Sequence, residues 1–135
     1  MSVTEEPTIL RFEGGIIGLP AVTQFVLTSV SADAPPDALF QLLRSVDGEV
    51  SIVVTQPWLL FPDYNPDLPN TDLSELGISS SEQMTIFNPV VLDADEGCVY
   101  VNLMGPFVVN VDSNAARQVV LADSEWPLRA RVDLS

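Results

Sequence analysis

The side chains that could carry out chemistry in this sequence are almost all carboxylates. The 135 residues include 19 Asp and Glu, one Cys and five Arg, but no His and no Lys. Without His the chain has no Ser–His or Cys–His dyad and no side chain that ordinarily titrates near neutral pH. Without Lys it can form neither a Schiff base nor the lysine contact of a phosphate-binding loop. Nucleophilic catalysis is therefore not expected.

The single cysteine, Cys98, follows a Gly at the start of a predicted strand, close to Asp93, Asp95 and Glu96. Nearby carboxylates raise the pKa of a thiol, so we interpret Cys98 as a small buried side chain rather than a nucleophile. One cysteine cannot form an internal disulfide, which fits a reducing compartment. Zinc sites use several Cys and His ligands, so the sequence predicts no zinc site.

Paired carboxylates can hydrolyse glycosides, and this is the one enzymatic device that the sequence retains. The acidic residues are spread along loops without a marked pairing motif. We therefore expect a protein that is not an enzyme, with no catalytic residue and no cofactor. A small carboxylate glycosidase stays open as an alternative, because the sequence does not show whether two carboxyl groups converge.

Two acidic segments partly resemble calcium-binding loops. In the first, Asp63, Asn65 and Asp67 supply oxygen ligands at the first, third and fifth positions. Leu68, however, stands where such a loop needs Gly. The second segment, which begins at Asp93, departs from the pattern at its Gly and at its last ligand position. Neither matches an EF-hand, so no metal site is predicted, and a carbohydrate- or calcium-binding β-domain stays open as a second alternative.

The formal net charge of −14 argues against several kinds of partner. Phosphate backbones and anionic membranes are bound by clustered Lys and Arg, so we expect neither direct nucleic-acid binding nor membrane binding. No apolar run reaches the about 18 residues of a membrane-spanning helix, and the acidic N-terminus does not resemble a signal peptide. A cytoplasmic location is expected. The acidity either steers a basic protein partner or serves solubility alone.

The pattern of turns and apolar segments predicts an all-β fold. Turn residues recur about every 8–12 residues, and the segments between them favour β-branched and aromatic side chains. We expect one domain over residues 1–135, folded as a closed or nearly closed antiparallel barrel with one short helix and a Pro-rich loop. The predicted strands are Thr8–Phe12, Gln24–Val30, Leu39–Val46, Val50–Thr55, Met84–Leu92, Cys98–Leu103, Phe107–Val111 and Gln118–Ala122.

Two features refine this prediction at the ends of strands. Asp47-Gly48 is the strongest hairpin signal in the chain and joins the third and fourth strands. In the fourth strand the alternation places Ile52 and Val54 on one face and Thr55 on the other. The tail after Trp126 is either a last edge strand or frayed.

The segment Gln56–Asn70 contains four prolines, which exclude a central strand or a helix interior. A short helical turn is predicted after it, at Asp72–Leu76. Within that turn Asp72 and Glu75 have the spacing of a capping box, and Gly77 suits the position after the helix.

Aromatic side chains in the Pro-rich loop are the leading candidates for protein binding. Proline stiffens the loop, so Trp58, Phe61 and Tyr64 are held in place at low entropic cost. They either plug the open end of the barrel or form an exposed binding patch, since aromatic anchors carry much of the energy of protein interfaces. The same two interpretations apply to residues between the last strands, namely Met104, Pro106 and Phe107.

Residues 101–110 read VNLMGPFVVN, and QVVL begins eight residues after Asn110. This compound pattern, with Asn102 and Pro106 at fixed spacing before the second Asn, resembles the C-terminal half of the flagellar assembly factor FliW. Gly18-Leu19-Pro20 and Pro62-Asp63-Tyr64 resemble further motifs of that family. The matching pieces, in order, cover about residues 8–131.

Two positions depart from the family pattern. Ala21-Val22 stand where Gly-Phe is usual, and Arg44 stands where Gln is usual. These departures leave the expected fold unchanged. They concern a turn and a strand face, so a partner contact that the family makes at either place would involve different side chains in this chain.

The resemblance implies a regulator and chaperone that binds flagellin in the cytoplasm. When flagellin has been exported, such a protein binds the RNA-binding translational repressor CsrA and relieves the repression of flagellin synthesis. We hypothesise that apolar groups in the Pro-rich loop and near Met104–Phe107 contact flagellin, with Asn102 beside them. The residues expected to face CsrA are the acids Asp63, Asp67, Asp72 and Glu75.

Overall fold

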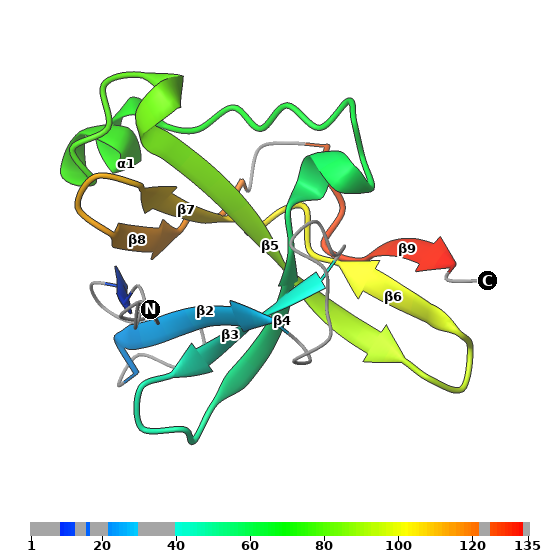
Figure 1. The fold of residues 1–135 in the computed structure, drawn as a ribbon. Coiled ribbons are helices and arrows are strands. Elements are labelled where there is room, and N and C mark those ends of the chain that lie inside the picture. The colour runs from blue at the N-terminus through cyan, green and yellow to red at the C-terminus, as the bar shows by residue number, and fades with distance from the viewer. Residues whose placement is uncertain (1–8, 13–15, 17–21, 30–39, 122–124, 134–135) are drawn as a thin grey trace, which may run out of the picture.

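The computed structural model describes residues 9–12, 16, 22–29, 40–121 and 125–133. These residues form one nine-stranded sheet with short helical segments (Figure 1), which confirms the all-β prediction. No helix in the described ranges is long and apolar enough to cross a membrane. The strands are β1 Ile9–Phe12, β2 Gln24–Ser29, β3 Phe40–Ser45, β4 Ser51–Thr55, β5 Met84–Asp93, β6 Cys98–Val101, β7 Phe107–Asn110, β8 Ala115–Gln118 and β9 Ala130–Asp133; the helical segments are η1 Pro57–Leu59, α1 Asn70–Glu75 and η2 Ser81–Gln83.

The strand pairings close into a ring. In the order β4-β3-β2-β1-β8-β7-β5 each strand is hydrogen-bonded to the next, and β5 pairs again with β4. These pairs are antiparallel except β1–β8, which is parallel. β6 and β9 continue the sheet from β5 and lie to one side of the ring in Figure 1. The expected closure is therefore present, with one parallel contact that the sequence pattern did not indicate.

Strand β5 joins the ring to this side arm because it pairs with three strands. Met84–Phe87 pair with β7, residues 88–90 pair with β4, and Val90–Asp93 pair with β6. Pro89 lies between the end of the β7 pairing and the start of the β6 pairing, and its carbonyl accepts the Asn102 N–H at 2.9 Å. A proline is tolerated in this central strand because its missing N–H faces the gap between two partners.

Phe12 is the centre of the main hydrophobic core. Its ring makes edge-to-face contacts with Phe25 at 5.5 Å and with Phe107 at 5.4 Å between centroids. All three side chains are at most 1% exposed. They come from β1, β2 and β7, so this packing holds together strands from both ends of the sequence. Burying one such side chain contributes about 1.5–3 kcal/mol.

The predicted strand Gln118–Ala122 is wrong, since the strand in this region is β8, Ala115–Gln118. The first two residues of β8, Ala115 and Ala116, pair with Arg11 and Phe12 of β1 and form the parallel contact. The apolar residues that suggested a later strand donate their backbone N–H groups to the loop between β6 and β7. Val119 and Leu121 pack their side chains in a second core cluster beside α1 instead.

One further strand prediction needs correction. The predicted strand Cys98–Leu103 ends at Val101, because the side chain of Asn102 caps a turn that begins there. Thr55 lies on the other face of β4 from Ile52 and Val54, as the alternation predicts, and is only 1% exposed. Both faces of β4 are covered, with Val54 in the core of Phe12 and Val53 against a third cluster around Tyr64. The predicted strand ends at Thr8, Val30, Leu39 and Ala122 lie outside the described residues.

The short helix occurs where it was predicted, but its capping differs. Helix α1 follows Pro69, and no side chain caps its N-terminus, so the predicted capping box of Asp72 and Glu75 is wrong. Gly77 has a φ of +73°, which agrees with its predicted position after the helix. The Asp47-Gly48 hairpin also forms, and the tail forms edge strand β9.

Tyr64 connects the Pro-rich loop to the junction in β5. Its hydroxyl donates to the Leu103 carbonyl at 2.7 Å and accepts from Asn88 Nδ2 at 3.4 Å. Asn88 Nδ2 also donates to the Asn102 carbonyl at 2.8 Å. The Trp126 ring meets the Tyr64 ring edge-on at 4.7 Å. One buried ring thus joins three segments that are far apart in the sequence.

Replacing Tyr64 by Phe should destabilise the fold by about 1–2 kcal/mol, because the buried Leu103 carbonyl loses its donor while the ring packing stays. The change in unfolding free energy is measured by urea denaturation. Tyr100→Phe is the matched control and should cost less than about 0.5 kcal/mol, since the Tyr100 ring is only half-buried. Equal losses in the two variants would contradict the role assigned to the Tyr64 hydroxyl.

The same hydroxyl should make stability depend on pH in the alkaline range. Burial raises the pKa of Tyr64 above its ordinary 10.0, and the hydrogen bond from Asn88 opposes this only in part. A raised folded-state pKa gives stability that is complete below the unfolded value and is lost as pH rises through the folded value. Unfolding free energy should therefore fall more steeply above pH 10.0 in the wild type than in Tyr64→Phe.

Candidate protein-binding surface

The start of the Pro-rich loop exposes apolar side chains in a fixed conformation. Pro57 begins the η1 turn, and the N–H groups of Leu60 and Phe61 both donate to its carbonyl. The Trp58 indole N–H donates to the Tyr64 carbonyl at 2.8 Å, which ties the two ends of the loop together. Trp58 is 44% exposed and Leu59 is 45% exposed. These two side chains therefore form a rigid apolar surface.

The aromatic candidates of this loop separate into an inner and an outer group. Tyr64 is 3% exposed and belongs to the third core cluster, and Phe61 packs against that cluster and is half-buried. Trp58 lies outside, with its ring centroid 6.4 Å from that of Tyr64. Tyr64 therefore packs in the core, whereas Trp58 is exposed, and a binding role of the exposed ring stays a prediction.

Two of the predicted acids stand beside this surface without a counter-charge. Asp63 and Asp67 are exposed residues of the same loop. In the ranges that the structure describes, neither carboxylate makes an ion pair or a side-chain hydrogen bond. We call Trp58, Leu59, Asp63 and Asp67 together the Trp58 surface.

The other two predicted acids are held by an arginine. Asp72 accepts Arg117 Nη1 at 2.8 Å, and Glu75 binds the same nitrogen. The hydrogen bonds that Arg117 donates to Asp72, and then to Glu75, raise the pKa of Arg117 above its ordinary value. Arg117 lies on β8, so the ion pairs fasten α1 to the sheet. They also offset part of the charge that these acids would present to a partner, and they leave neither carboxylate free as a catalytic acid.

Asn102 shapes the loop between β6 and β7. Its side-chain oxygen accepts the N–H groups of Met104 and Gly105 at 3.1 and 2.8 Å. Gln118 Nε2 donates to the Gly105 carbonyl at 3.0 Å. A Cβ at position 105 would lie 2.9 Å from that nitrogen, so only Gly fits without a shift of the amide. The side chain of Asn102 therefore holds the conformation of this loop through its hydrogen bonds to the loop backbone.

The remaining predicted residues of this region are mostly internal. Phe107 is 1% exposed, Pro106 is buried, and Met104 is half-buried against the cluster beside α1. Between the two interpretations of these side chains, the structure shows packing in the core. Asn110 plays a similar internal role, since its Nδ2 donates to the Leu76 carbonyl at 2.7 Å and joins β7 to the end of α1.

Several residues that support this surface escaped sequence reasoning. Leu59 is among the apolar groups of the Pro-rich loop considered as contacts, whereas Trp126 is not, because nothing in the sequence shows that its ring packs against Tyr64. Arg117 could have been noticed as one of only five cations in an acidic chain. Asn88 is fully buried, and its side-chain oxygen has no hydrogen-bond partner within the described part of the chain.

The described residues offer little for a metal or for catalysis. They contain no group of three or more Cys, Asp or Glu side chains placed to hold a metal ion. Cys98 is buried, as predicted. Asp93, in one of the calcium-like segments, accepts the Glu96 N–H at 3.1 Å and so closes a turn.

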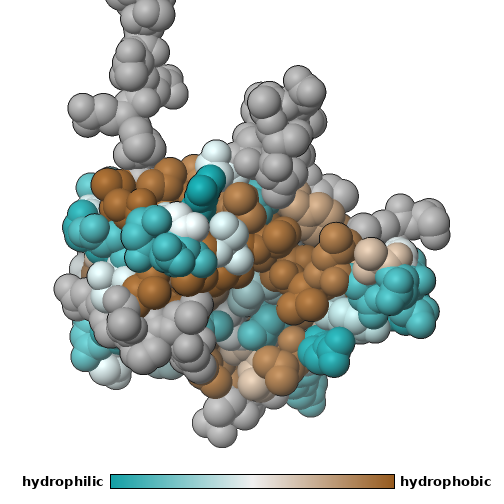
Figure 2. All heavy atoms as spheres, turned by 90° about the horizontal axis from the view of Figure 1, so that it is seen from below, coloured by the Kyte–Doolittle hydropathy of each residue, from teal (hydrophilic) through white to brown (hydrophobic). Residues whose placement is uncertain are grey.

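The Trp58 surface is not the only exposed apolar region. Figure 2 shows hydrophobic residues gathered in a band across one face of the molecule, bordered by hydrophilic ones. Among the described residues, the large hydrophobic side chains with substantial exposure are Ile9, Val46, Trp58, Leu59, Val91, Leu92, Val111, Val120 and Leu128. Interaction with other proteins is the activity that such a surface can support.

Comparison with known proteins identifies the family. The family model described as FliW protein matches residues 1–132. The flagellar assembly factor FliW of Caldicellulosiruptor saccharolyticus is 35% identical over 130 residues, which is 96% of this chain and 82% of that protein. That of Bacillus licheniformis is 33% identical over 125 residues, 92% of this chain and 84% of that protein.

The fold agrees with this assignment. A crystal structure of the flagellar assembly factor FliW superposes with a TM-score of 0.84 at 26% identity, covering 100% of this chain and 92% of that one. The resemblance read from the Asn102–Gln118 region is therefore confirmed over almost the whole sequence. This chain belongs to the FliW family of flagellar assembly factors.

Proposed function

We propose that this protein is a non-enzymatic regulator of flagellar assembly that acts in the cytoplasm by binding two proteins in turn. It binds flagellin, and when flagellin has been exported it binds a CsrA-type RNA-binding repressor and relieves repression of flagellin synthesis. Family membership supports the role in flagellar assembly. The observation that carries the protein-binding part is the Trp58 surface, where exposed apolar side chains lie beside unpaired carboxylates.

The Trp58 surface suits a basic partner. A protein that holds RNA presents clustered positive charge, and the net charge of −14 steers such a protein toward this chain. Exposed pairs of opposite charge contribute only about 0–1 kcal/mol each, so acidity alone does not give a tight complex. Trp58 and Leu59 can supply the remainder, because an aromatic anchor buried on binding dominates many interfaces.

The ion pairs support a division of the candidate contact residues. Asp63 and Asp67 have no counter-charge among the described residues, whereas Asp72 and Glu75 share Arg117. We therefore assign the first pair to the repressor and give the second pair a structural role. Phe107 and Pro106 are buried, so they support the fold rather than touch a partner.

Reversing the charge of Asp63 and Asp67 to Lys should slow association with the organism's own CsrA-type protein roughly tenfold at low salt. The dependence of the rate on salt should also flatten, because two steering charges are lost. Association rates measured by stopped-flow at about 50 mM and about 300 mM salt test this. Glu82→Lys with Asp95→Lys is the matched control, since it changes the charge equally at exposed residues of other elements. Rates that match between the two double variants would refute the assignment.

Trp58→Ala should weaken equilibrium binding of the same repressor by about 2 kcal/mol or more. The reason is that the variant removes the apolar anchor while leaving both carboxylates in place. Calorimetric titration measures the loss. Leu128→Ala is the control, because Leu128 is 54% exposed and lies outside the Trp58 surface. If the two variants bind equally well, the Trp58 surface is not the contact.

A further inference from the structure

Strands β1 to β4 present an exposed sheet face that bears arginines but no acidic side chain of their own. The chain contains 19 Asp and Glu, yet none of them lies within these four strands. The strands carry Arg11 and Arg44 instead. Within these four strands the charged side chains are therefore cationic only, in a protein of net charge −14.

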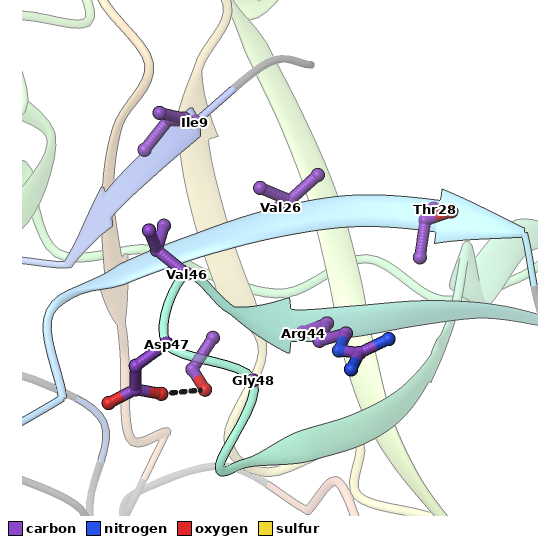
Figure 3. A pocket seen from close by; sticks show the side chains of 8 residues that line it. Ile9, Val26, Thr28, Arg44, Val46, Asp47 and Gly48 are labelled. Atoms are coloured by element: carbon purple, nitrogen blue, oxygen red, sulfur yellow. Dashed lines mark hydrogen bonds between the residues drawn. The ribbon is translucent and has the colours of Figure 1, made fainter.

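The register of the strands places apolar side chains beside Arg44 on this face. Ile9 pairs with Val26, and Val26 pairs with Arg44, so the three form one row across the sheet. Figure 3 shows these side chains, with Val46, around an open depression of about 550 Å³. Ile9 is 38% exposed and Val46 is 53% exposed. We call Ile9, Val26, Arg44 and Val46 the Arg44 face.

The guanidinium of Arg44 has no partner among the described residues. The other arginines are engaged: Arg11 donates to a backbone carbonyl, Arg117 and Arg131 bind carboxylates, and Arg129 lies over the Tyr100 ring. Arg44 Nη2 lies 3.4 Å from where a Cβ at Gly48 would stand, so its side chain lies over the hairpin turn. It is therefore positioned at the margin of the depression with its donors unused.

Among the described residues that line the depression, Asp47 is the one acid, and its carboxylate is already hydrogen-bonded. Asp47 accepts Ser45 Oγ at 2.6 Å and the Glu49 N–H at 3.0 Å. Figure 3 shows its carboxylate bonded within the turn, apart from the Arg44 guanidinium. Asp47 thus stabilises the hairpin and leaves Arg44 available for a carboxylate from outside.

We propose that the Arg44 face docks a segment of another protein that presents an apolar side chain next to a carboxylate. The guanidinium is the side chain best suited to bind a carboxylate, through two parallel hydrogen bonds. The apolar residues around it exclude water from the contact. Because an exposed ion pair contributes only about 0–1 kcal/mol, the apolar contact supplies most of the affinity and Arg44 supplies the selectivity.

Charge decides between the possible occupants. A second copy of this chain is disfavoured because each copy carries −14. A basic segment is repelled by Arg44 and fits the Trp58 surface instead. Resting on the proposed function, the partner assigned to the Arg44 face is therefore flagellin, and the RNA-binding repressor is assigned to the Trp58 surface.

Calorimetric titration with purified flagellin monomers tests the proposal. Arg44→Glu reverses the proposed ion pair, and Val46→Asp places a charge in the apolar part of the face. Each variant should weaken flagellin binding roughly tenfold, a loss of about 1.4 kcal/mol, while affinity for the CsrA-type repressor stays within about twofold. Arg129→Glu is the matched control, because it makes the same charge change at an exposed residue outside the face. Circular dichroism verifies that each variant is folded.

Each outcome of this experiment has a distinct meaning. If the wild type binds flagellin and both face variants bind it equally well, the Arg44 face is not the docking site, although the proposed function stands. If the wild type binds no flagellin, that part of the proposed function fails and this assignment fails with it. A wild-type dimer in sedimentation that Val46→Asp dissociates would identify a second copy as the occupant and would also overturn the proposal.

Discussion

The hydrogen bonding of β5 at Asn88 and Pro89 is the constraint on which the rest of the structure depends. At this point the strand changes partner on one edge, from β7 to β6, while β4 continues on the other edge. Pro89 offers no N–H to the gap, and the Asn88 amide donates to the Asn102 carbonyl that faces it. The Pro89 carbonyl in turn accepts the Asn102 N–H. These bonds allow one strand to belong both to the closed ring and to the arm of β6 and β9.

The loop that meets this junction explains why the family can be recognised from a short motif. Asn102, Gly105 and Gln118 form one hydrogen-bonded unit in which the Asn102 and Gln118 side chains bond the backbone of Met104 and Gly105. A change at any of them leaves a polar group of the loop unpaired or creates a steric conflict. The motif is therefore needed for the conformation of this loop, and it identifies the fold rather than a binding site. Of the surfaces that we assign to partners, the Trp58 surface overlaps a family motif only at Asp63, and the Arg44 face departs from the family pattern at Arg44.

Charge divides the acidic side chains by role. Some make hydrogen bonds or ion pairs within the protein: Asp47 closes a hairpin, Asp93 closes a turn, and Asp72 binds Arg117. Others, such as Asp63 and Asp67, remain exposed and unpaired in the described part of the chain. Because screening weakens charges beyond about 10 Å in 0.1 M salt, the position of an unpaired acid matters more than the total of −14. Two faces of opposite character can therefore coexist on one small protein.

The sequence by itself determined the fold class, most of the strands, the Asp47-Gly48 hairpin and the family, because alternation, turn residues and the Asn102 motif are local signals. It did not determine the parallel β1–β8 contact or the end of β8, since both depend on which distant strand is available. Only the tertiary structure decided that Phe107 and Tyr64 face inward while Trp58 and Leu59 face outward. The sequence does not distinguish a buried apolar side chain from an exposed one, because burial depends on residues far away in the chain.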